Sequence, residues 1–252
     1  MHRSRFGLFT IHLLLTLLLL ILLLGIGYIV WYAWPAWYLL EAERVTLLLV
    51  FSVLMLGPFA SLLVNTPGKA AHLLRMNLVV IGLLQFTALA AGAWTLWQGR
   101  PLFYVLTIDR IELMTAADFD SAARSELQDK KFNNPYSPLS QVDWVWAPLP
   151  ENTAEKEAII LSAILDDKDI TQMPGYFRPW SVALDDLRRQ LHPLSDLTGA
   201  LKIDVRQVQQ LALSLGQNET ELGWLRLDGS RRGGAMIFHR LSGKPLRFVA
   251  QR

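Results

Sequence analysis

Three long runs of apolar residues dominate the N-terminal part of the chain. They cover about residues 8–31, 45–64 and 78–97, and none of them contains Asp, Glu, Lys or Arg. A helix needs about 20 predominantly apolar residues to cross the hydrocarbon core of a bilayer. The pattern therefore predicts a membrane protein whose residues 1–98 form three transmembrane α-helices.

The first run also has the features of a secretory signal peptide, because Arg3 and Arg5 precede it. However, it is longer than the usual apolar region of about 7–15 residues, and no small-residue cleavage site follows it. Tyr28, Trp31 and Tyr32 lie where that site belongs. We therefore expect the run to remain in the protein as a membrane span.

The loops between the runs differ in charge, and this difference predicts their sides of the membrane. Arg3 and Arg5 precede the first run, and Lys69 and Arg75 lie between the second and third runs. The loop between the first and second runs carries two acids, Glu41 and Glu43, and one base, Arg44. Lys and Arg are enriched in cytoplasmic loops, and Trp and Tyr gather at membrane interfaces. We expect a cytoplasmic N-terminus and a periplasmic domain over residues 99–252.

Residues 99–252 alternate between strand-like and helix-like patterns. The aromatic and β-branched stretch 102–114 predicts a strand, and four prolines in 133–150 predict a loop or extended crossing in which Trp144 and Trp146 pack back on the domain. Helical spacing appears in four segments: a weak one at 116–131, and others at 153–167, 182–191 and 205–215. Ser181 and Asp204 are the expected N-caps of the last two.

Three short apolar segments separated by Gly-rich turns end the chain. They are GWLRL, AMIFHR and PLRFVA, and the turns lie at 228–234 and 242–244. This spacing is typical of a β-meander. The soluble part is therefore expected to be one small α+β domain with an antiparallel sheet.

Composition excludes several functions. The formal net charge is only +2, whereas nucleic-acid binding usually needs a strongly basic face. There is no cysteine, which removes disulfides, thiolate metal sites and thiol nucleophiles. The sequence also lacks the P-loop, GxGxxG, GxSxG and HExxH motifs. We expect a non-enzymatic protein without a cofactor or a metal.

The acidic clusters and the Gly-rich loop of the soluble part have simple structural interpretations. Asp118 and Asp120 form a short DxD pattern, and the cluster at 166–169 lacks the spacing of a calcium loop. The loop at 228–234 could form an anion-binding nest, but a solvated hairpin loop is the preferred interpretation.

Two polar side chains interrupt the apolar runs. His12 lies near the start of the first run, where anchoring at the cytoplasmic interface is favoured over a functional contact. Gln85 lies in the middle of the third run and needs hydrogen-bond partners in lipid. Those partners are either in the other spans, with Ser52 or Ser61 as candidates, or on the helix of another protein.

Small residues on the same span allow close helix contact. Ala88 and Gly92 form a small-xxx-small pair on the side of Gln85, so the three residues define a candidate face for a partner helix. Packing among the three spans is the alternative explanation for the same face.

Several segments in order resemble the TfpX/TfpZ family of type IV pilin accessory proteins: LGPFASLLVNTPGK (56–69), LLQFTALAAG (83–92), QGRP (98–101) and DRIEL (109–113). The WYAWP after the first run is similar to an aromatic-Pro exit of that family. Asn77 departs from the Asp expected before the third span. The motif positions are Gly57, Pro58, Pro67, Gly68, Lys69, Arg100, Pro101, Asp109 and Arg110.

The resemblance implies a multi-pass protein of the bacterial inner membrane that assists the stability or assembly of a cognate type IV pilin. Its partners would be that pilin, further pilus assembly proteins and the lipid bilayer. Type IV pilins carry a glutamate in an otherwise apolar N-terminal helix, so the amide of Gln85 would be a suitable temporary partner for that carboxyl group.

Two other classes of function fit the sequence less well. An envelope sensor would read a signal through residues 99–252, but the cytoplasmic side offers only a short N-terminus and one loop. A pilin-modifying membrane enzyme would need a catalytic group in or beside the spans, and the sequence offers none.

Overall fold

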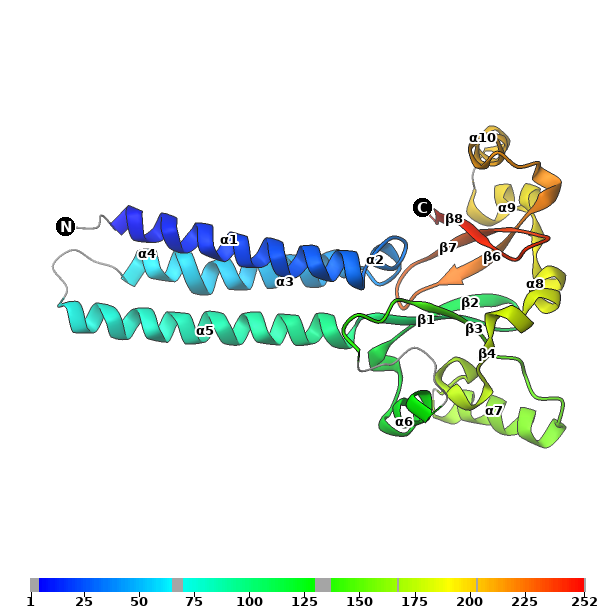
Figure 1. Cartoon of the computed structure of the whole chain (residues 1–252), viewed down its shortest axis with the longest axis horizontal. Helices are drawn as coiled ribbons and strands as arrows, with labels where there is room; N and C mark the ends of the chain where they lie inside the picture. The colour runs from blue at the N-terminus through cyan, green and yellow to red at the C-terminus, as the bar shows by residue number, and fades with distance from the viewer. Residues whose placement is uncertain (1–4, 65–69, 130–136, 167, 203, 252) are drawn as a thin grey trace. The chain divides into compact units, whose positions relative to one another are not determined.

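A computed structural model describes residues 5–64, 70–129, 137–166, 168–202 and 204–251 of the chain. The chain divides into two compact units, whose elements are labelled in Figure 1. The first unit is Met1–Ala33 with Glu41–Gly99, and the second is Trp34–Leu40 with Arg100–Arg252. Residues 34–40 thus belong to the second unit, although they lie in sequence between two apolar runs.

The first unit consists of long apolar helices. They are α1 (Arg5–Val30), a second helix made of α3 (Ala42–Leu54), η1 (Met55–Phe59) and α4 (Ala60–Val64), and α5 (Ala71–Gln98). By length and composition, these three helices could each cross a membrane. Helix α3 packs along α5, and α1 contacts the η1 turn.

The second helix changes its hydrogen bonding at Pro58. Residues Met55–Phe59 form a π-helical turn with Pro58 inside it. Proline has no N–H to donate, so the backbone bonds around it rearrange, and single π turns are a common result within α-helices. The hydroxyl of Ser61 donates to the Pro58 carbonyl at 2.7 Å.

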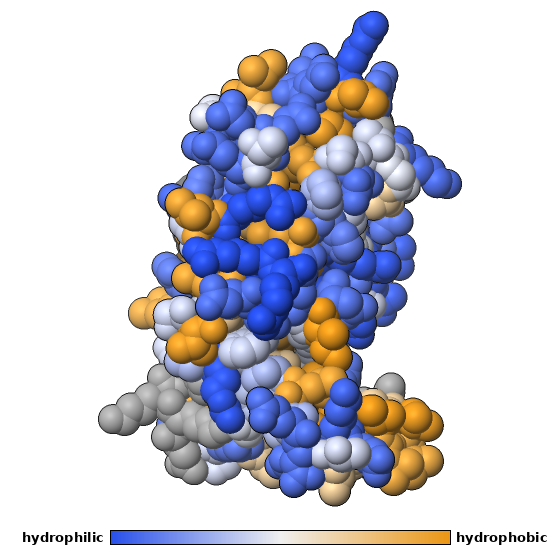
Figure 2. Space-filling model, turned by 90° about the vertical axis from the view of Figure 1, so that its right-hand side faces the viewer, coloured by the Kyte–Doolittle hydropathy of each residue, from blue (hydrophilic) through white to orange (hydrophobic). Residues whose placement is uncertain are grey.

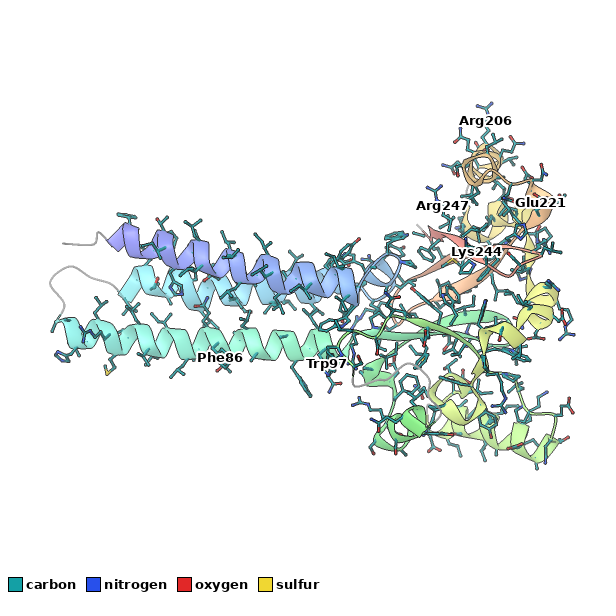
Figure 3. All side chains as sticks on the ribbon, in the orientation of Figure 1. Phe86, Trp97, Arg206, Glu221, Lys244 and Arg247 are labelled. Carbon is teal, nitrogen blue, oxygen red and sulfur yellow. The ribbon has the colours of Figure 1, made fainter. Side chains whose placement is uncertain are left out.

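Aromatic side chains join the C-terminal ends of α1 and α5. The hydroxyl of Tyr32 donates to the Leu96 carbonyl at 2.8 Å, and the rings of Trp31 and Trp97 meet edge to face at 5.5 Å. Trp97 is labelled in Figure 3. The observed role of these residues is to connect two helices, and their position at a membrane interface stays a prediction.

The described strands of the second unit form one eight-stranded mixed sheet, in the order β4-β3-β1-β2-β6-β7-β8, with β5 paired to β6. Strands β1 and β3 are parallel, as are β2 and β6, and the other pairs are antiparallel. The strands are β1 (Pro101–Leu106), β2 (Arg110–Thr115), β3 (Asp143–Trp146), β4 (Arg178–Pro179), β5 (His192–Pro193), β6 (Leu222–Asp228), β7 (Gly233–His239) and β8 (Pro245–Ala250).

The prediction of a small antiparallel sheet was therefore wrong. The stretch 102–114 is a hairpin and not one strand, because the chain turns at Thr107, whose N–H and hydroxyl both bond the Arg110 carbonyl. No Gly or Pro marks this turn. The Pro-rich stretch contains β3, which pairs in parallel with β1. The β-meander at the end of the chain was predicted correctly as β6, β7 and β8.

Helices cover the sheet, and most were predicted from their spacing. They are α6 (Ser121–Asp129), α7 (Thr153–Leu165), α8 (Leu184–Gln190), α9 (Leu197–Leu201) and α10 (Val205–Leu215), with 3₁₀ turns at Ala116–Asp118, Ile170–Gln172, Pro174–Tyr176, Trp180–Val182, Leu194–Asp196 and Glu219–Glu221. Asp204 caps α10, and Gly216, at a φ of 64°, ends it. Ser181 does not cap α8, because it lies inside a 3₁₀ turn.

Side chains alternate between the two faces of the sheet, and this alternation separates the cores. One face carries a core that includes Leu106, Leu225 and Phe238. The other face carries two cores, one under α6 and α7 and one under α9 and α10. In the first core, Tyr104 stacks on Trp144 with ring centroids 4.4 Å apart, and burial raises the pKa of its hydroxyl. Figure 2 shows a largely hydrophilic surface on one side of the molecule.

A short helix from between the apolar runs completes the first core. In α2 (Ala36–Leu39), Leu39 is fully buried in this core. Tyr38 reaches the far end of the chain, where its hydroxyl donates to the Gln251 carbonyl at 2.5 Å. The core of the second unit is thus built from two segments that are separated in sequence by two of the apolar helices.

Replacing Leu39 by Ala should destabilise the second unit. Truncating a buried Leu costs about 2–5 kcal/mol, which corresponds to a fall of roughly 10 °C in the unfolding midpoint of a domain of this size. Tryptophan fluorescence of the purified full chain in detergent, followed during heating, measures this midpoint. Leu241→Ala is the matched control, because Leu241 is 75% exposed. Equal midpoints for the two variants would contradict the assignment of α2 to this core.

Candidate functional site

A polar cluster connects two of the apolar helices. Gln85 on α5 lies beside two side chains of α1: its Oε1 accepts from His12 Nε2 at 2.8 Å, and its Nε2 donates to Thr16 Oγ1 at 2.8 Å. His12 and Thr16 are one helical turn apart, so they share a face of α1. The amide of Gln85 therefore uses both its acceptor and its donor within the first unit.

Gly57 leaves the space that this cluster needs. A Cβ atom at Gly57 would lie 2.4 Å from Cδ of Gln85, which is closer than real carbon contacts allow. Pro58 follows in the π-helical turn. The Gly-Pro motif of the second helix therefore has a physical role, because it lets the Gln85 amide lie against the backbone of η1.

A groove opens beside the cluster. Its volume is 280 Å³, and it is lined by residues of α1, α3 and α5: His12, Leu15, Thr16, Leu19, Val53, Gly82, Gln85, Phe86 and Leu89. Phe86 is 69% exposed and points outward from α5 (Figure 3). The walls are apolar and the three cluster residues supply the polar atoms, so the groove could accept an apolar helix ridge and offer it hydrogen bonds.

Two predictions about the polar residues need correction. Gln85 was expected to bond Ser52 or Ser61, but its partners are His12 and Thr16, and Ser61 bonds Pro58 instead. His12 was interpreted as an interfacial anchor, yet it is half-buried and paired with Gln85. The spacing of His12 and Thr16 in a run of leucines was the sequence signal for this pairing.

The small residues of α5 face the neighbouring helix. A Cβ atom at Gly92 would lie 2.3 Å from a methyl carbon of Leu49 on α3, and Ala88 is half-buried. Gln85, Ala88 and Gly92 thus lie on the inward side of α5. This geometry favours packing among the three helices, and contact of these residues with another protein's helix stays a prediction.

The other motif positions lie in the second unit or outside the described residues. Pro101 begins β1, and Arg100 is 2% exposed, with its carbonyl accepting from Ala116 N–H at 2.9 Å. Asp109 and Arg110 lie at the β1–β2 turn. Pro67, Gly68 and Lys69 fall outside the part of the chain that the structure describes.

Arg110 is the centre of an ion-pair cluster on the surface of the second unit. It lies 2.6 Å from Glu112, 3.1 Å from Asp109 and 3.8 Å from Asp169. Partial burial opposes the charge of Arg110, but the hydrogen bond to Glu112 and the three carboxylates outweigh it and raise the pKa. This cluster links the hairpin turn to the segment after α7.

The acidic motifs have structural partners. Asp118 accepts from the N–H and hydroxyl of Thr115, as a capping residue does. The N–H of Ala123 and the ammonium group of Lys168 lower the pKa of Asp120. Among the described residues, no group of three His, Cys, Asp or Glu side chains is arranged to hold a metal ion.

The Gly-rich loop between β6 and β7 contacts α2. The N–H of Arg232 donates to the Leu39 carbonyl at 3.4 Å, and its guanidinium carbon lies 4.9 Å from the centre of the Tyr38 ring. A Cβ atom at Gly229 would lie 2.5 Å from the Leu39 carbonyl oxygen, so glycine is required for this close approach. The loop therefore holds α2 on the sheet.

These features define a class of protein: an apolar three-helix unit with an internal polar cluster, joined to an α+β unit. The chain is 25% identical over 210 residues to fimbrial assembly protein, serogroup I, of Dichelobacter nodosus, across 81% of this chain and 77% of that protein. The fimbrial assembly protein of serogroup E1 is 23% identical, across the same 81% of this chain and 77% of the relative. The fimbrial assembly protein of serogroups C1 and C2 is 26% identical, across 43% of this chain and 82% of the relative. No family model and no solved structure matches the chain.

The similarity to the first two relatives extends over both units, because 81% of the chain exceeds either unit alone. The names of the relatives agree with the pilus-assembly part of the resemblance found in the sequence. The narrower TfpX/TfpZ family name stays a prediction.

Replacing Gly57 by Ala should disrupt the polar cluster. The added methyl group would push the Gln85 amide away from His12 and Thr16, and interhelical hydrogen bonds in membranes contribute about 0.6 kcal/mol each on average. We expect a loss of about 1 kcal/mol or more in the stability of the first unit. Unfolding of the purified protein in lipid micelles by a denaturing detergent measures the change.

Gly82→Ala is the matched control for this experiment, because nothing lies within 4 Å of a Cβ atom there. The same Gly-to-Ala change at position 82 should be neutral or stabilising, since Ala is the better helix former. If Gly57→Ala behaved like Gly82→Ala, the Gln85 cluster would not depend on Gly57.

Proposed function

We propose that this protein is a bacterial inner-membrane accessory protein that assists the stability or assembly of a cognate type IV pilin without catalysing a reaction. One observation carries the proposal: the similarity, across 81% of the chain, to a protein named fimbrial assembly protein. The sequence motifs that resemble the TfpX/TfpZ family support the narrower assignment, and several of them lie at structurally demanding positions such as Gly57 and Arg110.

The three long apolar helices support a membrane location. Their lengths and apolar composition suit a bilayer, and many of their large side chains, such as Leu47, Leu63 and Phe86, are exposed in the structure. The distribution of Lys and Arg supports a cytoplasmic N-terminus and a periplasmic second unit. In this orientation one protein offers both apolar helices and a water-exposed domain to its partner.

The groove beside the polar cluster is the proposed contact for the membrane helix of the partner. An apolar helix that lies against α1 and α5 would meet the Gln85 amide and the His12 ring at the floor of the groove. A carboxyl group on that helix needs a donor in a medium without water, and the second N–H of the Gln85 amide, which Thr16 does not use, can supply one. Ala88 and Gly92 support the site by letting α5 approach α3 closely.

A reporter that is active only in the periplasm tests the orientation. Fused after Gly99 it should be active, because three crossings place this position outside the cytoplasm, and fused after Gly68 it should be inactive. A cytoplasm-active reporter at the same two positions is the control and should give the opposite pattern. Activity of the periplasmic reporter after Gly68 alone would refute the proposed orientation.

Filling the groove tests the function. In a deletion strain, surface pili and the level of the cognate pilin should fall while its transcription persists, and the wild-type gene should restore both. Gly82→Leu should restore them only in part, because the new side chain enters the open space of the groove. Since membrane contacts of this kind contribute about 1–2 kcal/mol, we expect a decrease of several-fold in pilin level.

Gly25→Leu is the matched control, because a Cβ atom at Gly25 also meets nothing within 4 Å and this residue does not line the groove. Immunoblots of the accessory protein itself show whether each variant is present at the normal level. Unchanged pilin and pili in the deletion strain would refute the proposed function, whereas full rescue by Gly82→Leu would refute only the groove.

A further inference from the structure

The second unit ends in a strand with one open edge, and we propose that this edge binds an extended segment of another polypeptide that joins the sheet next to β8. The segment would carry both apolar and uncharged polar side chains and one acidic side chain. Such strand addition combines main-chain hydrogen bonds with pockets for alternate side chains. The proposal rests on β8 and its surroundings and does not depend on the function in pilus assembly.

The open edge follows from the sheet order and the register. Strand β8 is a terminal strand that pairs only with β7, in antiparallel register. The N–H of Gln251 donates to the Gly233 carbonyl at 3.1 Å, so positions 251, 249 and 247 direct their backbone groups toward β7. The alternation then directs the N–H and C=O groups of Phe248 and Ala250 away from β7.

Within the described part of the chain, these four outward backbone groups have no backbone hydrogen-bond partner. The pairing of β6 with β7 gives an independent check. The N–H of Arg240 donates to the Glu221 carbonyl at 2.8 Å, and the same alternation then directs Gly234 and Met236 toward β6. Gly234 pairs with Ala250, and Met236 pairs with Phe248. Because Gly234 and Met236 direct their backbone groups toward β6, away from β8, Ala250 and Phe248 direct theirs away from β7.

Two hollows flank the open edge, one on each face of the sheet. The first, of 530 Å³, lies between β8 and α10 and is lined by Leu211, Ser214 and Val249 among others. The second, of 520 Å³, lies between β8 and the start of α2 and is lined by Trp34, Met236 and Phe248 among others. Successive side chains of a strand point to opposite faces. An added strand would therefore place alternate side chains in the two hollows.

The hollows also define the chemistry of the occupant. Both hollows mix apolar and polar lining, with Gln207, Gln210 and Ser214 in the first, and Arg247 is the charged residue that borders both. Arg247 extends from β8 toward α10 (Figure 3), where it donates to the Ser214 hydroxyl at 3.0 Å. Among the described residues it has no salt bridge to an acidic group. An acidic side chain on the α10 face of the added strand would complement it.

A second copy of this chain suits the site less well than a different polypeptide. If two β8 strands paired antiparallel, both Arg247 side chains would lie on the same face of the joined sheet, where like charges are unfavourable. Neither hollow contains an acidic residue that would neutralise them. The charge pattern thus favours an acidic partner strand.

Two short blocked peptides serve as probes, Thr-Val-Glu-Val-Thr-Val and the same peptide with Lys in place of Glu. They are added to the full-length protein in detergent micelles, and amide hydrogen exchange is followed residue by residue. The Glu peptide should slow exchange at Phe248 and Ala250 but not at Arg247 or Val249, whose amides are already bonded to β7. It should bind about fivefold more tightly than the Lys peptide, and Arg247→Glu should reverse this preference.

Substitution at the outward position Ala250 tests the backbone contacts. Ala250→Pro removes an N–H that the β7 ladder does not use, so the fold should persist while binding of the Glu peptide falls by about tenfold. Ala250→Val keeps the N–H and is the matched comparison, which should bind the Glu peptide more tightly than Ala250→Pro does. If Ala250→Pro does not fold, the exchange pattern in the wild type and the reversal by Arg247→Glu decide the question.

The proposal is overturned if neither peptide protects Phe248 and Ala250, or if the Lys peptide binds as well as the Glu peptide. Light scattering of the protein without peptide adds a separate measurement. A dimer that Ala250→Pro dissociates would show that the edge is occupied by a second copy, which also overturns the proposal.

Discussion

The burial of Leu39 is the constraint on which the second unit depends. Its side chain is fully buried in the first core, beside residues of β6 and β7, although it lies in sequence between two apolar helices. Tyr38 and the loop after β6 hold the same short helix in place. The domain therefore cannot complete its core from residues 100–252 alone. The seven residues 34–40 that connect the first two apolar helices are therefore also part of the domain core.

The first unit depends on a different constraint, which is that a polar side chain among apolar helices needs hydrogen-bond partners within the protein. Gln85 meets this requirement through His12 and Thr16, and the absence of a side chain at Gly57 makes room for it. Gln85, His12 and Thr16 also line a groove with apolar walls. The glycine of the Gly-Pro motif in the second run is thus explained by Gln85 in the third run, whose amide occupies the space beside Gly57.

Different parts of the sheet have different roles. Its central strands bury three cores, and the ion-pair cluster around Arg110 lies at the hairpin turn where β1 leads into β2. The two ends of the sheet differ. Strand β4 is only two residues long, whereas β8 is six residues long and is bordered by a hollow on each face. A longer open edge is the more capable binding site, because it offers more backbone groups.

The elements with strong local signals were predictable from the sequence. Apolar length identified the three long helices, Asp204 and Gly216 marked the ends of α10, and Gly-rich turns separated the last three strands. In each case, neighbouring residues in the chain supply the deciding interactions. The need of Gln85 for hydrogen-bond partners was also evident, since an amide in an apolar run has few alternatives, but whether it faces inward was left open.

Long-range contacts decided the rest. The turn at Thr107 has no Gly or Pro, and the parallel pairing of β1 with β3 and of β2 with β6 joins segments far apart in the chain, so local patterns do not encode either. The partners of Gln85 are 69 and 73 residues away. The addition of α2 to the domain core depends on packing against strands that follow much later. Periodicity shows which side of an element is apolar, but only the tertiary structure determines what covers that side.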